Sequence, residues 1–153
     1  MEMVTAARKQ LLLKPSVTTL VGQRIWKWGE EGSLEGTGHA AIVLRNGGQW
    51  SKPGKNSQEY PILTVECCAD MSRDADGEPS KDDAEDRAMA VFREVDRHLH
   101  QVSRYHRFWP ETAVNHSEGL YVAGCFRGSE PTAPTTKYGV KVIRVTYDLN
   151  VFH

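Results

Sequence analysis

The sequence is poor in cysteine, with only three among its 153 residues. Cys67 and Cys68 are adjacent, and Cys125 lies far from them along the chain. An odd number of cysteines in this arrangement does not form the disulfide framework that holds small secreted proteins together. We therefore expect reduced thiols that pack in the interior.

The chain also lacks an excess of charge and a long apolar run. Its 19 basic and 20 acidic residues leave a formal net charge of -1, which is typical neither of a nucleic-acid coat nor of a disordered acidic chain. No apolar stretch approaches the ~20 residues that cross a bilayer, and the first residues lack a signal-peptide core. We expect one domain over residues 1–153, made in the cytosol, with no membrane partner.

Familiar catalytic motifs are missing as well. The sequence has no GxSxG elbow, no phosphate-binding loop and no dinucleotide fingerprint. Cys125 is a conceivable nucleophile, with His98, His106 or His116 as its base. It lies within an apolar run, however, where a thiol usually behaves as a small hydrophobic group. We expect no catalytic residue and therefore no enzyme.

Metal and cofactor sites find little support. On a helix, His98 and His100 point about 200° apart, because each residue advances the helix by about 100°, so they cannot share a metal ion. The acidic stretch 70–86 resembles a calcium loop only poorly, since Lys81 stands where a bidentate glutamate is required. We interpret this stretch as a solvated loop and helix start, with an acidic contact surface as the alternative. No metal and no cofactor are expected.

The N-terminal residues carry clear signals of local structure. Thr5 is a candidate cap for a first helix, which we expect to end at Lys14 because Pro15 disfavours helical geometry in the residue before it. Ser16 is the expected cap of a second, short helix, and Gly22 supplies its left-handed end. An alternating strand follows, in which Trp26 and Trp28 share one face.

Two further strands are expected in the first half of the chain. Residues 39–45 form a compact apolar run, and the Asn-Gly-Gly sequence at 46–48 predicts a turn that begins a hairpin. Residues 61–69 alternate between two sets of side chains, as in a strand with one better-buried face.

The second half of the chain contains the best helix signal, over residues 80–101. Acidic residues gather at its start, where the helix dipole favours them. Its apolar residues recur every three or four positions, which predicts packing against a sheet; they are Ala84, Ala88, Val91, Phe92, Val95 and Leu99. Strands are expected at 119–126 and 138–151. The stretch between them, 127–137, has two prolines and no apolar periodicity, so we expect it to project from a long hairpin and to contact a partner.

Together these elements predict an α+β fold. We expect a mostly antiparallel sheet with one long amphipathic helix packed on it and a short N-terminal helix pair. In the order of these elements, and in residues 11–25, 61–68, 84–99 and 139–151, the sequence resembles the tail terminator proteins of long-tailed siphophages. These are also called tail-completion or minor tail proteins, and the resemblance is to those of phages with actinobacterial or other Gram-positive hosts.

The resemblance implies a structural virion protein that forms a hexameric ring on the head-proximal end of the tail tube. Such a ring stops tube polymerisation and joins the tail to the head. Its implied partners are other copies of itself, the major tail tube protein and the connector or stopper protein of the head. DNA passes through the lumen without specific binding. The implied location is the virion tail, with assembly in the host cytoplasm.

The residues expected at these contacts follow from the predicted loops and exposed aromatics. We expect the subunit, tube or neck interface to include Trp26, Trp28, Trp50, Glu130, Pro131, Thr132, Pro134 and Lys137. Like charge prevents DNA from adhering to a channel, so the expected lumen-facing acids are Asp74, Asp76 and Glu78. Two alternatives stay open: another neck, connector or tube protein of the virion, and a small cysteine-dependent enzyme.

Overall fold

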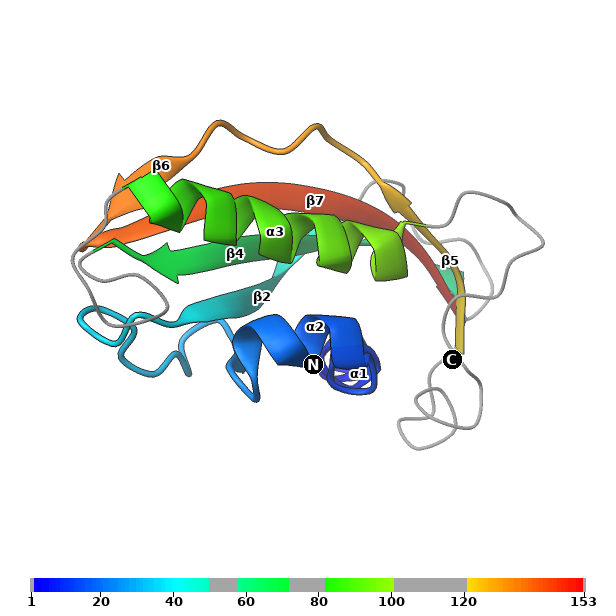
Figure 1. Ribbon diagram of the computed structural model, residues 1–153. Helices are drawn as coiled ribbons and strands as arrows, with labels where there is room; N and C mark the ends of the chain where they lie inside the picture. Colours follow the sequence, from blue (N-terminus) through cyan, green and yellow to red (C-terminus); the bar gives the residue numbers. More distant parts are fainter. Residues whose placement is uncertain (1, 50–57, 72–81, 101–120, 153) are drawn as a thin grey trace.

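The computed structural model describes residues 2–49, 58–71, 82–100 and 121–152 (Figure 1). Within them, the helices are α1 (Glu2–Leu12), α2 (Pro15–Val21) and α3 (Asp82–Leu99). The strands are β1 (Ile25–Lys27), β2 (Ala40–Gln49), β3 (Gln58–Glu59), β4 (Pro61–Asp70), β5 (Tyr121–Arg127), β6 (Thr135–Lys137) and β7 (Val140–Phe152). The expected α+β class, with a mostly antiparallel sheet, is confirmed.

The described strands form one sheet that is organised around β7. The neighbours follow the order β1-β2-β4-β7, and only the β1–β2 pair is parallel. The short strand β3 continues the register of β4 along one side of β7. Strands β5 and β6 pair with the opposite side of β7. Strand β7 therefore holds both halves of the sheet together.

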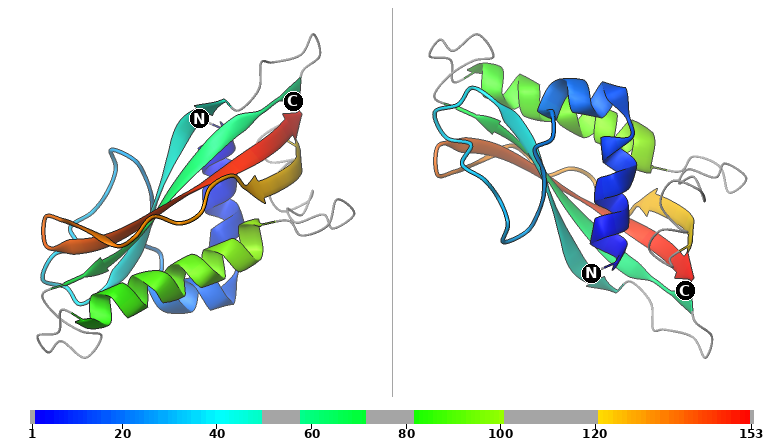
Figure 2. Two further views of the ribbon diagram at one scale, coloured as in Figure 1. Left: turned by 90° about the horizontal axis from the view of Figure 1, so that it is seen from above. Right: turned by 90° about the horizontal axis from the view of Figure 1, so that it is seen from below.

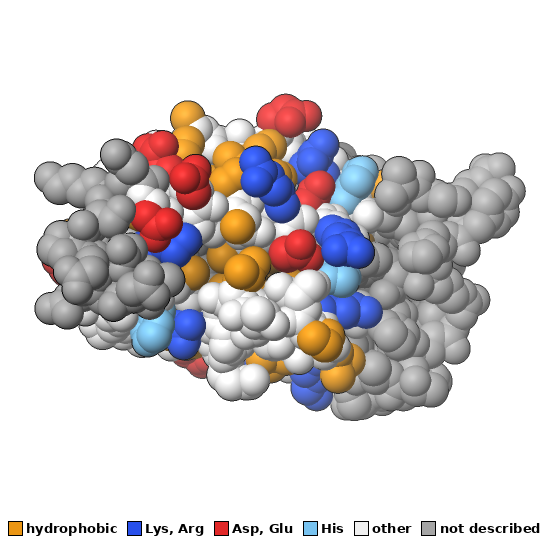
Figure 3. Space-filling view, viewed as in Figure 1, with side chains coloured by type: hydrophobic (Ala, Val, Ile, Leu, Met, Phe, Trp, Pro, Cys, Tyr) orange, Lys and Arg blue, Asp and Glu red, His pale blue; other side chains and the backbone are white. Residues whose placement is uncertain are grey.

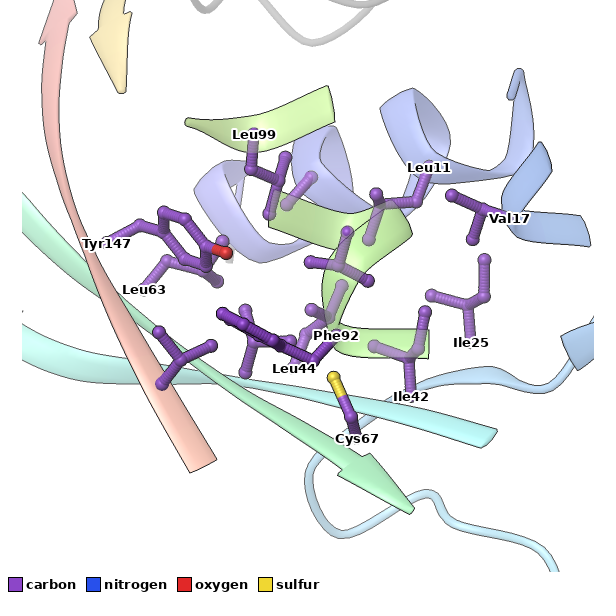
Figure 4. Packing of buried hydrophobic residues seen from close by; sticks show 14 of the residues in the cluster. Leu11, Val17, Ile25, Ile42, Leu44, Leu63, Cys67, Phe92, Leu99 and Tyr147 are labelled. Carbon is purple, nitrogen blue, oxygen red and sulfur yellow. The ribbon is translucent and has the colours of Figure 1, made fainter. Parts of the chain in front are cut away.

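The main hydrophobic core lies between the helices and one face of this sheet. Figure 4 shows side chains from α1, α3 and the sheet, among them Leu11, Phe92 and Leu63, meeting in one interior. All six apolar residues predicted for the face of α3 are buried. The long-helix prediction is therefore confirmed, because its three- and four-residue spacing places one continuous apolar stripe on the sheet.

A polar network ties the end of α3 to the sheet. The Tyr147 hydroxyl donates to Asp96 Oδ1 at 2.9 Å, and Arg127 Nη1 donates to Asp96 Oδ2 at 2.8 Å. The backbone N–H of Arg127 donates to His100 Nδ1 at 2.9 Å. Burial, together with the Asp96 carboxylate, raises the pKa of Tyr147. These bonds fix the position of β5 relative to α3.

The N-terminal helix pair differs from the prediction at both starts. Helix α1 begins before Thr5, which is therefore an interior residue and not a cap. Helix α2 has Lys14 as its N-cap and Pro15 as its first residue, because proline suits the first helical position. Ser16 is consequently inside α2, and its hydroxyl is hydrogen bonded to His98 Nε2 of α3 at 2.6 Å. The predicted Ser16 cap was wrong, and the side chain instead links two helices.

The expected turn at residues 46–48 was also wrong. Strand β2 continues through Asn46 to Gln49, with an irregular register between these two residues opposite β4. A Cβ on Gly47 would lie 2.5 Å from Thr64 Oγ1, so glycine permits the two strands to approach. Gly48 has φ of +105° within the same irregularity. The glycines here serve a β-bulge instead of a reversal.

Contrary to the prediction, the stretch 127–137 does not project from the sheet. Gly128 N donates to Thr146 O at 2.8 Å, and Thr132 N donates to Arg144 O at 2.9 Å. The N–H of Arg144 donates back to Thr132 Oγ1 at 3.0 Å. The stretch therefore runs along the outer edge of β7, between β5 and β6 (Figure 1). Pairing with β7 satisfies backbone groups that an isolated loop would leave to water.

Candidate functional site

The sheet face opposite the helices carries a second, smaller apolar cluster. It consists of Leu34, Ala41, Val43, Cys68 and Val142, with Trp26 and Val140 packed against it. Figure 2 shows α2 and α3 on one side of the sheet and the segment of residues 28–39 on the opposite side. This segment supplies Leu34, whose side chain is buried. Among the described residues, this irregular segment covers only part of the face.

A cleft of about 380 Å³ lies between this segment and the turn that joins β6 to β7. Its apolar lining includes Trp26, Leu34, Val43, Cys68, Val140 and Val142. Its charged lining consists of Glu31, Glu35, Glu66 and Lys137. Arg144 Nη2 lies 3.7 Å from Glu66 Oε1, on the neighbouring strand. The cleft therefore combines an apolar floor with a predominantly acidic rim.

Tyr138 stands at this rim in an unusual backbone conformation. It has φ of +49° and is followed by Gly139 with φ of +73°, so the two residues form a tight turn between Lys137 and Val140. A left-handed backbone costs an L-residue other than glycine about 1 kcal/mol or more. The Tyr138 side chain is nonetheless 84% exposed. Sequence reasoning missed this residue, although a tyrosine before glycine between two strands was the available signal.

The acidic segment 28–39 is held in place through Arg87 of α3. Arg87 Nη1 donates to Gly38 O at 2.9 Å and Nη2 donates to Asp70 O at 2.6 Å. The Gly38 N–H donates to Asp70 Oδ2 at 2.8 Å. Asp83 forms an ion pair with the same guanidinium. One arginine thus joins the end of this segment, the end of β4 and the first turns of α3.

The two tryptophans that were expected to share a face lie in different grooves. Trp26 is half-buried in the cleft, and a Cβ on Gly32 would lie 3.1 Å from its ring. Trp28 is 58% exposed, with the Arg45 guanidinium 5.7 Å from a ring centroid, in a groove of about 540 Å³ beside β1. They separate because β1 ends at Lys27 and the chain turns there.

The remaining predicted interface residues lie along the outer edge of β7. Glu130, Thr132 and Lys137 are exposed, whereas Pro131 and Pro134 are half-buried. Because proline has no N–H, these positions discourage a further strand from pairing there. Of this group, Lys137 also lines the cleft. The predicted residues Trp50, Asp74, Asp76 and Glu78 lie outside the described residues.

The three cysteines are all buried and free of disulfides. Burial raises the pKa of Cys67 and Cys125, and it raises the pKa of Cys68 to about 12. A buried thiol with a raised pKa is a poor nucleophile at neutral pH. His98 is bonded to Ser16, and His106 and His116 lie outside the described residues. The raised pKa of Cys125 is the opposite of what an activated thiol nucleophile requires.

Two features are absent from the described part of the chain. No group of three or more His, Cys, Asp or Glu side chains there is placed to hold a metal ion. None of the helices in the described ranges combines the length and apolar content that crossing a membrane requires.

Comparison with known proteins gives a likeness in fold. No family model matches the sequence, and no curated protein matches it. The chain aligns with a chain of the solved structure "Virion of native gene transfer agent (GTA) particle", with a TM-score of 0.61 and 14% identity. The alignment covers 99% of this chain and 96% of that chain. A second solved chain aligns over 100% of this chain and 96% of its own length at 12% identity, but its TM-score of 0.49 is too low to establish a shared fold.

Proposed function

We propose that this protein is a structural protein of a virion, and specifically a tail terminator that forms a ring on the end of the tail tube. The observation that carries the proposal is the likeness in fold, along nearly the whole of both chains, to a chain of a gene transfer agent virion. The resemblance of the sequence to siphophage tail terminators points independently to the same class of protein.

The surface of the subunit is compatible with assembly into a ring. A ring of identical subunits needs two different, complementary surfaces on each subunit, and two unlike end faces for its neighbours along the particle axis. The described chain has an acid-rimmed cleft on one sheet face, a second groove at exposed Trp28, and an outer edge carrying Glu130 and Thr132. These surfaces differ in charge and shape, as a multi-partner role requires.

The proposed ring is hexameric and lies at the head-proximal end of the tail. Its partners are the tail tube protein on one face and the connector or stopper protein of the head on the other. DNA crosses the lumen, and we propose that Asp74, Asp76 and Glu78 line it, since like charge keeps DNA from adhering. The protein acts by binding and geometry, without catalysis or cofactor.

Electron microscopy of lysates from a virus that lacks only this gene tests the proposal. Loss of a terminator removes the stop on tube growth, so we expect over-long tails of variable length without heads. Tails of normal length that fail to attach to heads would assign the protein to the neck instead. Normal, infectious virions would refute a structural role and would return attention to an enzymatic one. Complementation with the wild-type gene is the control.

A further inference from the structure

After its first residue, Glu2, the helix pair carries charge of one sign only. Residues 3–24 contain four basic residues and no acidic one: Arg8, Lys9, Lys14 and Arg24. Arg8 Nε donates to Ile25 O at 2.7 Å and Arg24 Nε donates to Ala40 O at 2.9 Å, which attaches the helices to the sheet.

Apolar side chains accompany this positive charge. Leu13, between the two helices, is 52% exposed, and Leu20 on α2 is 37% exposed. The helical side of the molecule is seen in Figure 3, where hydrophobic side chains lie at the surface among Lys and Arg side chains. We call Lys9, Leu13, Lys14 and Leu20 the basic corner. A partner that binds here would bury the two leucines, and the flanking charges would orient that partner.

The segment across the sheet has the opposite charge. Residues 28–39 contain three glutamates, Glu30, Glu31 and Glu35, and no lysine or arginine. Two of them, Glu31 and Glu35, line the cleft whose floor is made by Trp26 and Leu34. The cleft is thus the complement of the basic corner in both respects, because it offers an apolar floor to leucine and carboxylates to lysine.

We propose that the basic corner of one subunit binds the acidic cleft of a second copy of this chain. The helices and the segment 28–39 lie on opposite sides of the sheet (Figure 2), so the two surfaces of one molecule cannot meet each other. A contact between unlike surfaces is head-to-tail, and it closes into a ring when the rotation between subunits permits. The inference deepens the proposed function, on which it rests, by naming the surfaces that join neighbouring subunits.

Charge reversal and its repair test this contact. The corner variant is Lys9→Glu with Lys14→Glu, and the cleft variant is Glu31→Lys with Glu35→Lys. Sedimentation velocity from ~10 μM to ~1 mM covers weak and strong self-association. We expect the mass of the wild type to rise with concentration above that of a single chain, and each variant to associate at least about tenfold more weakly. An equimolar mixture of the two variants restores opposite charges at every contact, so association returns, as it does in the chain that carries all four changes.

A matched control reverses two charges elsewhere. Arg93→Glu with Arg97→Glu alters the net charge as the corner variant does, on exposed positions of α3 outside both surfaces. It is expected to associate like the wild type. Circular dichroism establishes that each variant is folded before it is compared.

Three results would overturn the inference: a wild type that stays monomeric throughout the range, a control that weakens as much as the corner variant, or a mixture that fails to recover. A second design does not depend on charge. Since the three native thiols are buried, Leu13→Cys and Glu35→Cys introduce accessible thiols, and mild oxidation of a mixture is expected to link the two variant chains to each other. Links only between identical variants would contradict the head-to-tail contact.

The failure of this inference is distinguishable from failure of the proposed function. Over-long tails in the gene deletion, together with normal tails in a virus carrying the corner variant, would leave the terminator role standing and remove this interface. Self-association through the named surfaces, together with normal virions in the deletion, would support this interface and refute the terminator role.

Discussion

The buried thiols predict a steep loss of stability at alkaline pH. Burial raises the pKa of Cys67 and Cys125 above the ordinary 9.0, and raises that of Cys68 to about 12. Each thiol therefore stays protonated in the folded protein at a pH where the unfolded chain releases its proton. The stabilisation is fully present below about pH 9 and is lost as the pH rises from there through the folded pKa.

The size of the effect follows from proton linkage. Between about pH 8 and about pH 10 an unfolded thiol changes from about one-tenth to about nine-tenths ionised, which lowers the free energy of unfolding by about 1.4 kcal/mol for each buried thiol. Three thiols give about 4 kcal/mol, a large share of the 5–15 kcal/mol that is typical of a whole domain.

Urea unfolding under reducing conditions, at steps between these two pH values, measures the loss. Because lysines and tyrosines also titrate there, the informative quantity is the difference between wild type and Cys125→Ala. The cavity that alanine leaves lowers stability equally at every pH, whereas the alkaline loss is expected to shrink by about 1.4 kcal/mol. Parallel curves for the two proteins would show that Cys125 ionises in the folded state, and would refute the buried-thiol reasoning.

Three further predictions concern the polar contacts and the strained turn. Tyr147→Phe removes one bond to the Asp96 carboxylate and is expected to lower the free energy of unfolding by about 1.5–3 kcal/mol, measured by urea titration at neutral pH. Tyr138→Gly relieves a positive φ at an exposed position, so we expect a gain of about 1 kcal/mol by the same assay. Arg87→Ala removes the hydrogen bonds to Asp70 O and Gly38 O and the ion pair with Asp83. We expect it to lower the free energy of unfolding by about 2–3 kcal/mol and to speed hydrogen exchange in residues 28–39. No change in these readouts would contradict the corresponding contact.

Periodic elements were predictable from the sequence because the spacing of their apolar residues shows which face is buried. The apolar repeat of α3 and the alternation in β4 each predict one face that meets the core, and both of these faces lie in the main core. The other face of β4 is also buried, at Thr64, Glu66 and Cys68, which the alternation did not predict. The same is true of β7, where Ile143, Val145 and Tyr147 face the helices while Val142 faces away. Local patterns of this kind survive folding because burial selects them directly.

Features that depend on distant partners were not predictable. The stretch 127–137 lacks periodicity, and what places it is hydrogen bonding to Thr146 and Arg144, which follow later in the chain. Gly47 resembles a turn residue, but its role is set by the close approach of Thr64. The cleft likewise forms only when residues 28–39 cross the sheet, so local sequence patterns could not predict which residues line it.

The separation of charge narrows the kind of assembly that this chain can form. A two-fold dimer that pairs unlike surfaces must form both contacts at once, with the corner of each subunit on the cleft of the other. The two surfaces lie on opposite sides of the sheet (Figure 2), so a single flat interface does not hold both. A two-fold dimer that pairs like surfaces instead brings like charges face to face, which costs several kcal/mol. Contact between unlike surfaces avoids this repulsion. In a linear chain of subunits, however, the corner at one end and the cleft at the other end stay unpaired. Only closure pairs them all. A subunit with these two surfaces is therefore suited to a ring, which ends its own growth and can end that of a tube beneath it.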